Sequence, residues 1–330
     1  MGFAERVEIM ENDAPHNYNV LQRQSCLRWL ARWLLGNDAP LTEGAIAPFT
    51  DEELRVTPGG QVMLLPGARS TYDFIAEEAA ELAARRAPAW AAPSDEERRA
   101  KVRAVTGIRP LDEIPEPEIE DLGAGRYVVT REDGVRLPAL VFNPEEAAAG
   151  GIALYVDQEG KAALLAAGGP GAALGAGPRA VCAVDIRGTG ETRQTDRPWA
   201  PDFGPNLREC LMAYLLGDSY VAMRAEDILA CARAAARFAP SGRVDLVAVG
   251  NAGIPALHAA ALEPRLFASV RIARALSSWT DVIAAGRHRD QLVNAVHGAL
   301  AVYDLPDLAA MLGEKLRIED PVDARGAPVK

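Results

Sequence analysis

The sequence predicts an α/β protein whose core is a doubly wound, mostly parallel sheet. Short apolar runs at residues 151–156, 181–185 and 244–249 have the composition of buried strands. Longer segments with apolar residues at helical spacing alternate with such runs, and residues 220–238 are the clearest of them. Strands that alternate with helices along a chain form parallel sheets with helices on both faces.

The first part of the chain is predicted to contain one strand followed mainly by helices. Residues 6–11 alternate apolar and polar side chains, which favours a strand, and residues 19–35 have helical spacing. Trp29 and Trp33 widen the apolar face of that helix, so we expect it to pack against a large partner. Further helices are expected after the capping boxes that begin at Thr50 and Ser94, the latter helix reaching about Val105, and over residues 70–87, ending at Arg85-Arg86 before Pro88.

An acidic segment separates this part from the rest of the chain. Residues 112–121 hold six acids and two prolines, a composition typical of an extended, solvated connector. We therefore expect three regions. They are the remnant of a first domain at residues 1–36, a helical and acidic linker at residues 37–125 and a second domain at residues 126–330.

The second domain is predicted to begin with a β-hairpin. Residues 127–130 and 135–142 favour strands, and the Asp133-Gly134 pair between them is a hairpin-turn signal. The later strands are expected at residues 151–156, 181–185, 244–249, 267–272 and 315–318, and the helices at residues 161–167, 220–238 and 254–262.

Composition and charge narrow the classes of partner. Lysine and arginine number 35 against 46 acidic residues, and the net charge of −11 argues against a nucleic-acid-binding surface. No apolar run approaches the ~18 residues that a membrane-spanning helix needs, and no signal peptide is visible. We expect no membrane partner, and we expect the four cysteines, Cys26, Cys182, Cys210 and Cys231, to be buried thiols.

The segment from residue 244 to residue 258 has the frame of a nucleophile elbow. A buried strand runs into a tight turn with glycines on both sides, and a helix of small residues follows. Aligned on Gly250, the apex of the turn is Ala252, and shifted by one residue it is Asn251; neither is a competent nucleophile. Two interpretations remain open, a plain strand–turn–helix unit and an elbow that kept its shape without its chemistry.

A second motif follows the strand at residues 181–185, where the chain continues as Asp-Ile-Arg-Gly-Thr-Gly. We expect Arg187 to brace this loop through paired hydrogen bonds while the glycines let it turn sharply. A phosphate-binding loop is the competing interpretation. Gly188 and Gly190 lack the third glycine of the dinucleotide fingerprint, and no Gly-Lys-Ser/Thr follows, so no nucleotide cofactor is expected.

Together these segments resemble a known family. Residues 11–18, 28–34, 184–193 and 244–258 are similar to the acetyl-xylan-esterase-like α/β-hydrolases, in a tandem form with a second, degenerate hydrolase-like domain. The resemblance implies a sheet of the α/β-hydrolase type and ester hydrolysis by a Ser-His-acid triad. It places the triad histidine at His16, the one catalytic residue that we assign, and places the serine and the acid in a region outside this chain.

The other polar candidates are expected to be structural. Asp323 follows the last expected strand, where a triad acid could lie, but no matching strand and histidine follow it. No histidine pair has metal-ligand spacing with a third donor, so no metal is expected. The residues judged structural are the histidines His258, His288 and His297, of which His288 is expected to be solvated, and the serines Ser219, Ser277 and Ser278.

Two functions follow from these observations. The first is the C-terminal portion of a carboxylic ester hydrolase that is not competent alone and works with a catalytic hydrolase domain, upstream or in trans, on an ester substrate. The alternative is a non-catalytic hydrolase-like module that packs on or regulates a partner protein.

Overall fold

A computed structural model describes residues 2–132, 134–194 and 201–329 of the chain. The chain divides into two compact units, Met1–Ala68 and Arg69–Lys330, which are described separately below. The sequence predicts boundaries after residues 36 and 125 because it assigns the three regions to different parts of a tandem hydrolase. The division into compact units does not test that assignment, so these boundaries stay a prediction.

The first unit is built around helix α1 (Val20–Leu35). Asn19 and Gln22 form a capping box at its start, and Gly36 ends it in the left-handed conformation, with a φ of 64°. The unit's other elements are η1 (Ala4–Arg6), α2 (Asp51–Leu54) and η2 (Val62–Leu64).

The strand predicted at residues 6–11 is wrong. Arg6 ends the single turn η1, and residues 7–18 belong to no strand or helix. A strand needs a neighbour to accept its backbone hydrogen bonds, and the described residues of this unit contain no other strand. Ala31 is the one buried residue among them, so the helix presents its apolar side chains to solvent.

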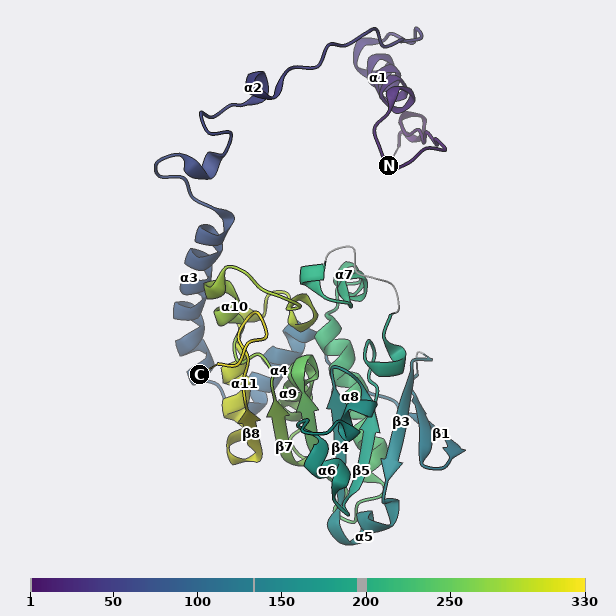
Figure 1. Ribbon diagram of the computed structural model, residues 1–330, viewed down its shortest axis with the longest axis vertical. Coiled ribbons are helices and arrows are strands. Elements are labelled where there is room, and N and C mark those ends of the chain that lie inside the picture. The colour runs from purple at the N-terminus through teal and green to yellow at the C-terminus, as the bar shows by residue number, and fades with distance from the viewer. Residues whose placement is uncertain (1, 133, 195–200, 330) are drawn as a thin grey trace. The chain divides into compact units, whose positions relative to one another are not determined.

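The second unit contains one sheet of eight strands, with helices before and between them (Figure 1). Its strands are β1 (Glu118–Gly123), β2 (Arg126–Thr130), β3 (Arg136–Phe142), β4 (Ile152–Asp157), β5 (Ala180–Val184), β6 (Val244–Val249), β7 (Phe267–Ala273) and β8 (Leu316–Glu319). Its α-helices are α3 (Thr71–Ala91), α4 (Asp95–Thr106), α5 (Ala147–Gly150), α6 (Ala172–Ala176), α7 (Leu207–Leu215), α8 (Tyr220–Ala236), α9 (Gly253–Leu262), α10 (Trp279–Ala285) and α11 (Leu305–Leu312). The 3-10 turns are η3 (Pro144–Glu146), η4 (Lys161–Leu165), η5 (Gly190–Thr192), η6 (Pro201–Phe203), η7 (Gly250–Ala252), η8 (Leu292–Asn294), η9 (Ala299–Ala301) and η10 (Gly313–Lys315).

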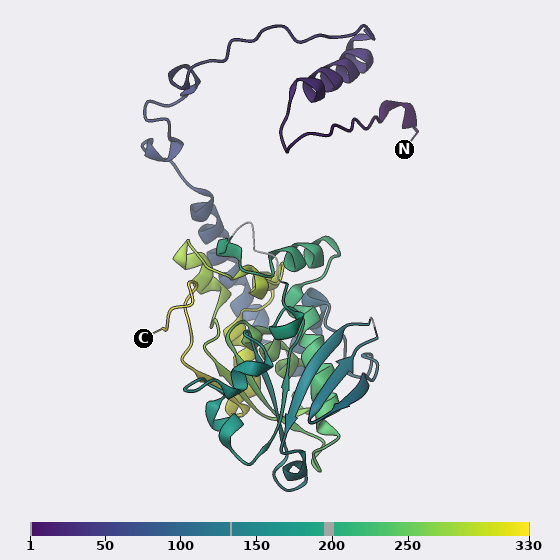
Figure 2. The same ribbon diagram turned by 45° about the vertical axis from the view of Figure 1, so that its right-hand side comes forward.

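The strands follow the order β1-β2-β3-β5-β4-β6-β7-β8 across the sheet. Figure 2 shows the same sheet turned by 45° from the view of Figure 1. The pairs from β1 to β5 are antiparallel, and those that join β5, β4, β6, β7 and β8 are parallel. The predicted fold class, a doubly wound and mostly parallel sheet, is confirmed. Every strand expected from residue 126 onward is present, although the turn residue Asp133 lies outside the described residues.

Two expectations in the preceding segment are wrong in detail. The acidic segment is more than a connector, because Glu118–Gly123 pairs with β2 as an edge strand while its side chains stay largely exposed, and Ile114 is buried in the core. Helix α3 does not stop before Pro88 but continues to Ala91, with the proline inside it. A proline costs a helix one hydrogen bond, and the burial of Trp90, which stacks on Tyr303 with ring centroids 6.2 Å apart, favours the longer helix.

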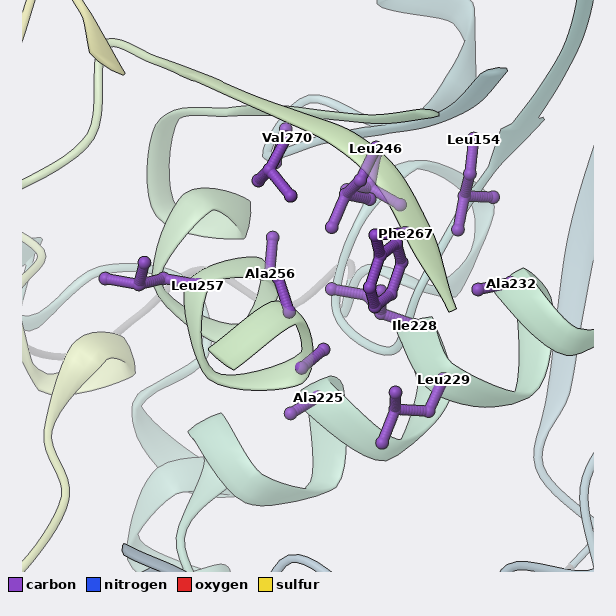
Figure 3. Close-up of a cluster of buried hydrophobic side chains, with 14 of the residues drawn as sticks. Leu154, Ala225, Ile228, Leu229, Ala232, Leu246, Ala256, Leu257, Phe267 and Val270 are labelled. Carbon is purple, nitrogen blue, oxygen red and sulfur yellow. The ribbon is translucent and has the colours of Figure 1, made fainter. Parts of the chain in front are cut away.

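Apolar side chains cover both faces of the central strands. Figure 3 shows part of the larger cluster, in which Leu154, Leu246 and Phe267 of the sheet meet Ile228 of α8 and Leu257 of α9. A second cluster on the opposite face includes the side chains of Ala153, Tyr155, Val181, Ala183, Val247 and Val249. This two-sided burial explains why the central strands are continuous apolar runs in the sequence.

Three of the predicted buried thiols are buried, at Cys182, Cys210 and Cys231, but Cys26, on α1 of the first unit, is exposed. Among the described residues, no helix combines the length and the apolar character needed to cross a membrane.

Candidate functional site

The turn after β6 has the cramped geometry that the sequence predicts. Gly250 adopts the left-handed conformation with a φ of +62°, and a Cβ atom there would overlap the side-chain amide of Gln158. At Gly253, the start of α9, a Cβ would lie 2.7 Å from the side chains of Ala275 and Ile272. Glycine at these two positions therefore lets the helix leave the strand sharply and pack closely on the sheet.

The apex of this turn is Gly250 rather than Ala252 or Asn251. In a nucleophile elbow the reacting residue is the strained one, between the strand and the helix. Gly250 is the residue of this turn with a positive φ, whereas Ala252 has a φ of −73° and is fully buried. The alignment made from the sequence was thus shifted along the turn, and the apex carries no side chain at all.

The backbone amide that follows the apex is occupied by a side chain. Asn251 N–H donates to Oε1 of Gln158 at 3.0 Å. In hydrolases with this elbow, the N–H after the nucleophile is one of the oxyanion-hole donors. Gln158 directly follows β4, the strand beside β6, so its amide fills the space where a reacting carbonyl oxygen would otherwise accept this hydrogen bond.

The side chain of Asn251 ties the turn to the loop before η8. Its Nδ2 donates to Oδ2 of Asp290 at 2.9 Å, and its Oδ1 accepts from Nδ2 of Asn294 at 3.1 Å. Burial raises the pKa of Asp290 to about 6, against the nearby charges of Arg224 and Arg193, which lower it. The other oxygen of this carboxyl group, Oδ1, is buried without a hydrogen-bond partner among the described residues.

A pocket of about 760 Å³ opens beside this turn, at the carboxyl ends of the parallel strands. Ligand sites of open α/β sheets lie at this edge. Gln158, Gly250, Arg274 and Asp320 line it, each directly after a strand. The longer loops contribute Arg289, Asp290, Gln291, Val322, Arg325, Gly326 and Pro328.

The acidic residues at the β4 end of the pocket are held by partners of their own. Asp157 accepts a hydrogen bond from the Tyr155 hydroxyl at 2.6 Å and another from the Glu159 N–H at 2.8 Å. Burial raises the pKa of Asp157. Glu159 forms an ion pair with Arg193 at 3.2 Å. Within the part of the chain that the structure describes, no three histidine, cysteine or acidic side chains are grouped as a metal site.

The loop after β5 is braced as predicted. Nε and Nη2 of Arg187 donate to the two oxygens of Asp227 on α8, at 2.8 and 2.7 Å. The buried Nζ of Lys161 donates to Asp185 at 2.6 Å, which ties the loops after β4 and β5 together. The motif therefore positions two loops beside the pocket, and Arg187 is part of the fold rather than of a phosphate site.

His16, the predicted catalytic residue, lies on the exposed segment before α1 in the first unit. Among the described residues it has no hydrogen-bond or ion-pair partner that would orient its ring. Its assignment as a triad histidine stays a prediction.

The other histidines have the structural character that was expected, with one difference. His258 is fully buried between Ile254 O at 2.7 Å and the Tyr303 hydroxyl at 2.8 Å, and burial lowers its pKa to about 4. His297 meets the ring of Tyr214 edge to face, with ring centroids 5.3 Å apart. His288, which was expected to be solvated, is half-buried against the ring of Phe203.

The remaining candidates cap turns and helices. The carboxylate of Asp323 accepts the N–H groups of Arg325 and Ala327 at 2.8 and 2.9 Å, which lowers its pKa. Ser219 caps α8 and Ser278 caps α10.

Sequence reasoning missed several residues of the pocket. Gln158, Arg274 and Asp320 could have been found, because polar residues that directly follow parallel strands meet at one edge of the sheet. Asp290 and Arg325 come from loops whose path the sequence does not determine, and neither lies in a recognisable motif.

Comparison with known proteins identifies the architecture. No family model and no curated protein matches the chain. Among solved structures, a candidate acetyl xylan esterase from Bacteroides fragilis is similar, with a TM-score of 0.56 and 12% identity over 78% of this chain and 77% of that one. Acetyl xylan esterase 1 from Thermoanaerobacterium sp. JW/SL YS485 aligns with a TM-score of 0.42 and 16% identity over 72% of this chain and 89% of that one.

The first of these similarities establishes the fold. The second unit has an α/β-hydrolase fold, an eight-stranded and mostly parallel sheet with flanking helices. At this level of identity the likeness concerns the fold alone, and the function has to be argued from the site.

Proposed function

We propose that the chain is a non-catalytic hydrolase-like module that accompanies a catalytic ester hydrolase domain. Its second unit retains the α/β-hydrolase fold and a pocket at the usual edge of the sheet. We propose further that it corresponds to the degenerate second domain of the tandem form, and that the first unit, with His16, is the end of the catalytic domain.

The observation that carries this proposal is the turn after β6. A nucleophile needs a hydroxyl, thiol or carboxylate at the apex, and the apex is Gly250. The oxyanion donor beside it is bound by Gln158. An acyl-transfer site needs an attacking atom and a free hydrogen-bond donor for the negative charge that develops on the carbonyl oxygen. This turn has neither.

The partner is supported by the surface of the first unit. Helix α1 leaves Leu27, Leu30, Leu34 and Leu35 between 38% and 78% exposed. Side chains of this size in one short helix favour burial against another protein surface. A catalytic hydrolase domain, whether joined upstream or supplied in trans, would cover them and would provide the serine and the acid for His16.

The experiment is ester turnover by the full chain, with p-nitrophenyl acetate as the substrate. We expect no hydrolysis above the buffer background, and no change on substitution His16→Ala. The variant Gly250→Ser should stay inactive, because the new side chain would overlap Gln158 and the Asn251 N–H is already bonded.

A rate clearly above background would contradict the proposal, and the variants would show where the activity resides. Loss of that rate in His16→Ala would assign it to the first unit. Loss in Asp290→Asn would assign it to the pocket.

A further inference from the structure

Backbone strain is concentrated around the pocket. Five non-glycine residues of the described chain have a positive φ, and three of them, Arg274, Asp290 and Asp320, line it. Their φ angles are 54°, 53° and 47°. Each such residue costs the fold about 1–3 kcal/mol, and such strain gathers at ligand-binding sites. The pocket is therefore built with features that the fold alone does not require.

Three arginines of the pocket have no ion-pair partner among the described residues. Arg274, Arg289 and Arg325 are exposed, and none forms an ion pair or a side-chain hydrogen bond with a described residue. Arg193, in contrast, is paired with Glu159 near the same pocket. Four acidic residues, Asp157, Glu159, Asp290 and Asp320, also line the pocket. Asp157 accepts hydrogen bonds from Tyr155 and the Glu159 N–H, and Glu159 is paired with Arg193, so the three guanidinium groups are the part of the lining that can bind an anion.

The pocket also offers hydrogen-bond acceptors. The carboxylate of Asp320 is exposed at the rim, and it forms no ion pair with a described residue. Acceptors of this kind disfavour a ligand that carries negative charge alone. They favour one that also carries a hydroxyl group, because an O–H can donate to them.

We propose that this pocket binds a small hydroxycarboxylate. Arginine binds carboxylates through paired, charge-assisted hydrogen bonds, so Arg289 and Arg325, with Arg274, would hold the carboxylate. The exposed carboxylate of Asp320 would accept a hydrogen bond from the hydroxyl group. The inference rests on the proposed function only in that the pocket serves binding and not ester hydrolysis.

The test is isothermal titration of the full chain with citrate and L-malate. Each probe has a counterpart that lacks only the hydroxyl, tricarballylate for citrate and succinate for malate. We expect at least one of the hydroxy acids to bind with one site per chain and its counterpart to bind more weakly. The variants Arg289→Ala and Arg325→Ala should each weaken binding about tenfold or more.

Arg287→Ala is the matched control, because Arg287 is an exposed arginine in the same loop that does not line the pocket. It should bind the probe as the unsubstituted chain does. Failure of both hydroxy acids to bind would overturn the inference, as would equal binding of sulfate or of the counterparts, or equal losses in Arg287→Ala and Arg289→Ala.

The two proposals fail separately. No binding together with no ester turnover would contradict only the hydroxycarboxylate site. Binding together with turnover of p-nitrophenyl acetate would contradict only the non-catalytic role.

Discussion

Two groups of arginines in the second unit have opposite surroundings. The first, here the α8 cluster, comprises Arg109, Arg131 and Arg187 with Glu226 and Asp227. Arg131 donates to Asp227 at 2.9 Å and to Glu226 at 2.6 Å, and Arg109 donates to Glu226 at 2.7 Å. The second group lines the pocket and has no such partners among the described residues.

The difference separates structural charge from charge that is free to bind. No residue of the α8 cluster has a positive φ, and the cluster joins α8 to the loops before β1, after β2 and after β5. In the pocket, Arg274 is both strained and unpaired. Residues whose conformation and charge are both unfavourable for the isolated fold are the ones that a ligand could compensate.

The largest effect should come from breaking the α8 cluster. Asp227 is fully buried and accepts hydrogen bonds from both Arg131 and Arg187. Removal of one partner from a buried ion pair leaves uncompensated charge, so Asp227→Ala should lower the free energy of unfolding by about 3–5 kcal/mol. Urea unfolding followed by circular dichroism measures this loss.

Glu116→Ala is the control for this prediction. Glu116 pairs with Arg233 and Arg237, but its side chain is 58% exposed. The loss there should be about 1 kcal/mol or less. Equal losses in the two variants would mean that the α8 cluster is no more structural than a surface ion pair.

A smaller effect, of opposite sign, is expected at Asp290. Its pKa in the folded protein, about 6, lies above the ordinary value of 3.8, so the native state binds more protons between these two pH values. Stability should therefore fall as the pH rises from 4 to above 6 on account of this group. Asp290→Asn should remove this dependence and stabilise the protein at pH 8 by about 1–2 kcal/mol, after allowance for solvent screening.

Asp323→Asn provides the matched comparison, because hydrogen bonds from Arg325 and Ala327 lower the pKa of Asp323 instead. That variant should be less stable than the unsubstituted chain at pH 8, not more stable. Chemical denaturation at pH 4 and pH 8 distinguishes the two. A destabilised Asp290→Asn at pH 8 would show that the Asp290 carboxylate is as well compensated as those of the α8 cluster.

The sequence predicted what is local and missed what depends on distant pairing. The apolar runs at β4, β5 and β6 and the capping boxes at Thr50 and Ser94 contain their own signals, and each prediction is confirmed. Strand β1 was missed because its acidic side chains read as solvated, while the hydrogen bonds of its backbone come from β2.

The candidate site was predicted less well for the same reason. The frame of the turn after β6 was recognised, but its apex depends on one dihedral angle, at Gly250, that small neighbours do not specify. The contact between Asn251 and Asp290 joins residues far apart in the sequence. An arginine of the pocket can bind a ligand only if no acidic side chain is paired with it. The sequence does not show this pairing, because it depends on where the loops lie in the fold.

The smallest expected effect tests the strain itself. At a positive φ an L-residue is penalised and glycine is not, so Arg274→Gly should be more stable than Arg274→Ala by about 1 kcal/mol. Both variants lose the guanidinium group, so their difference isolates the backbone. At Arg289, whose φ is not positive, the order should reverse, with glycine the less stable by about 0.5–1 kcal/mol. Thermal unfolding of the four variants measures both differences. If the glycine variant were less stable than the alanine variant at both positions, Arg274 would not be strained. The pocket and the α8 cluster would then differ in charge pairing alone.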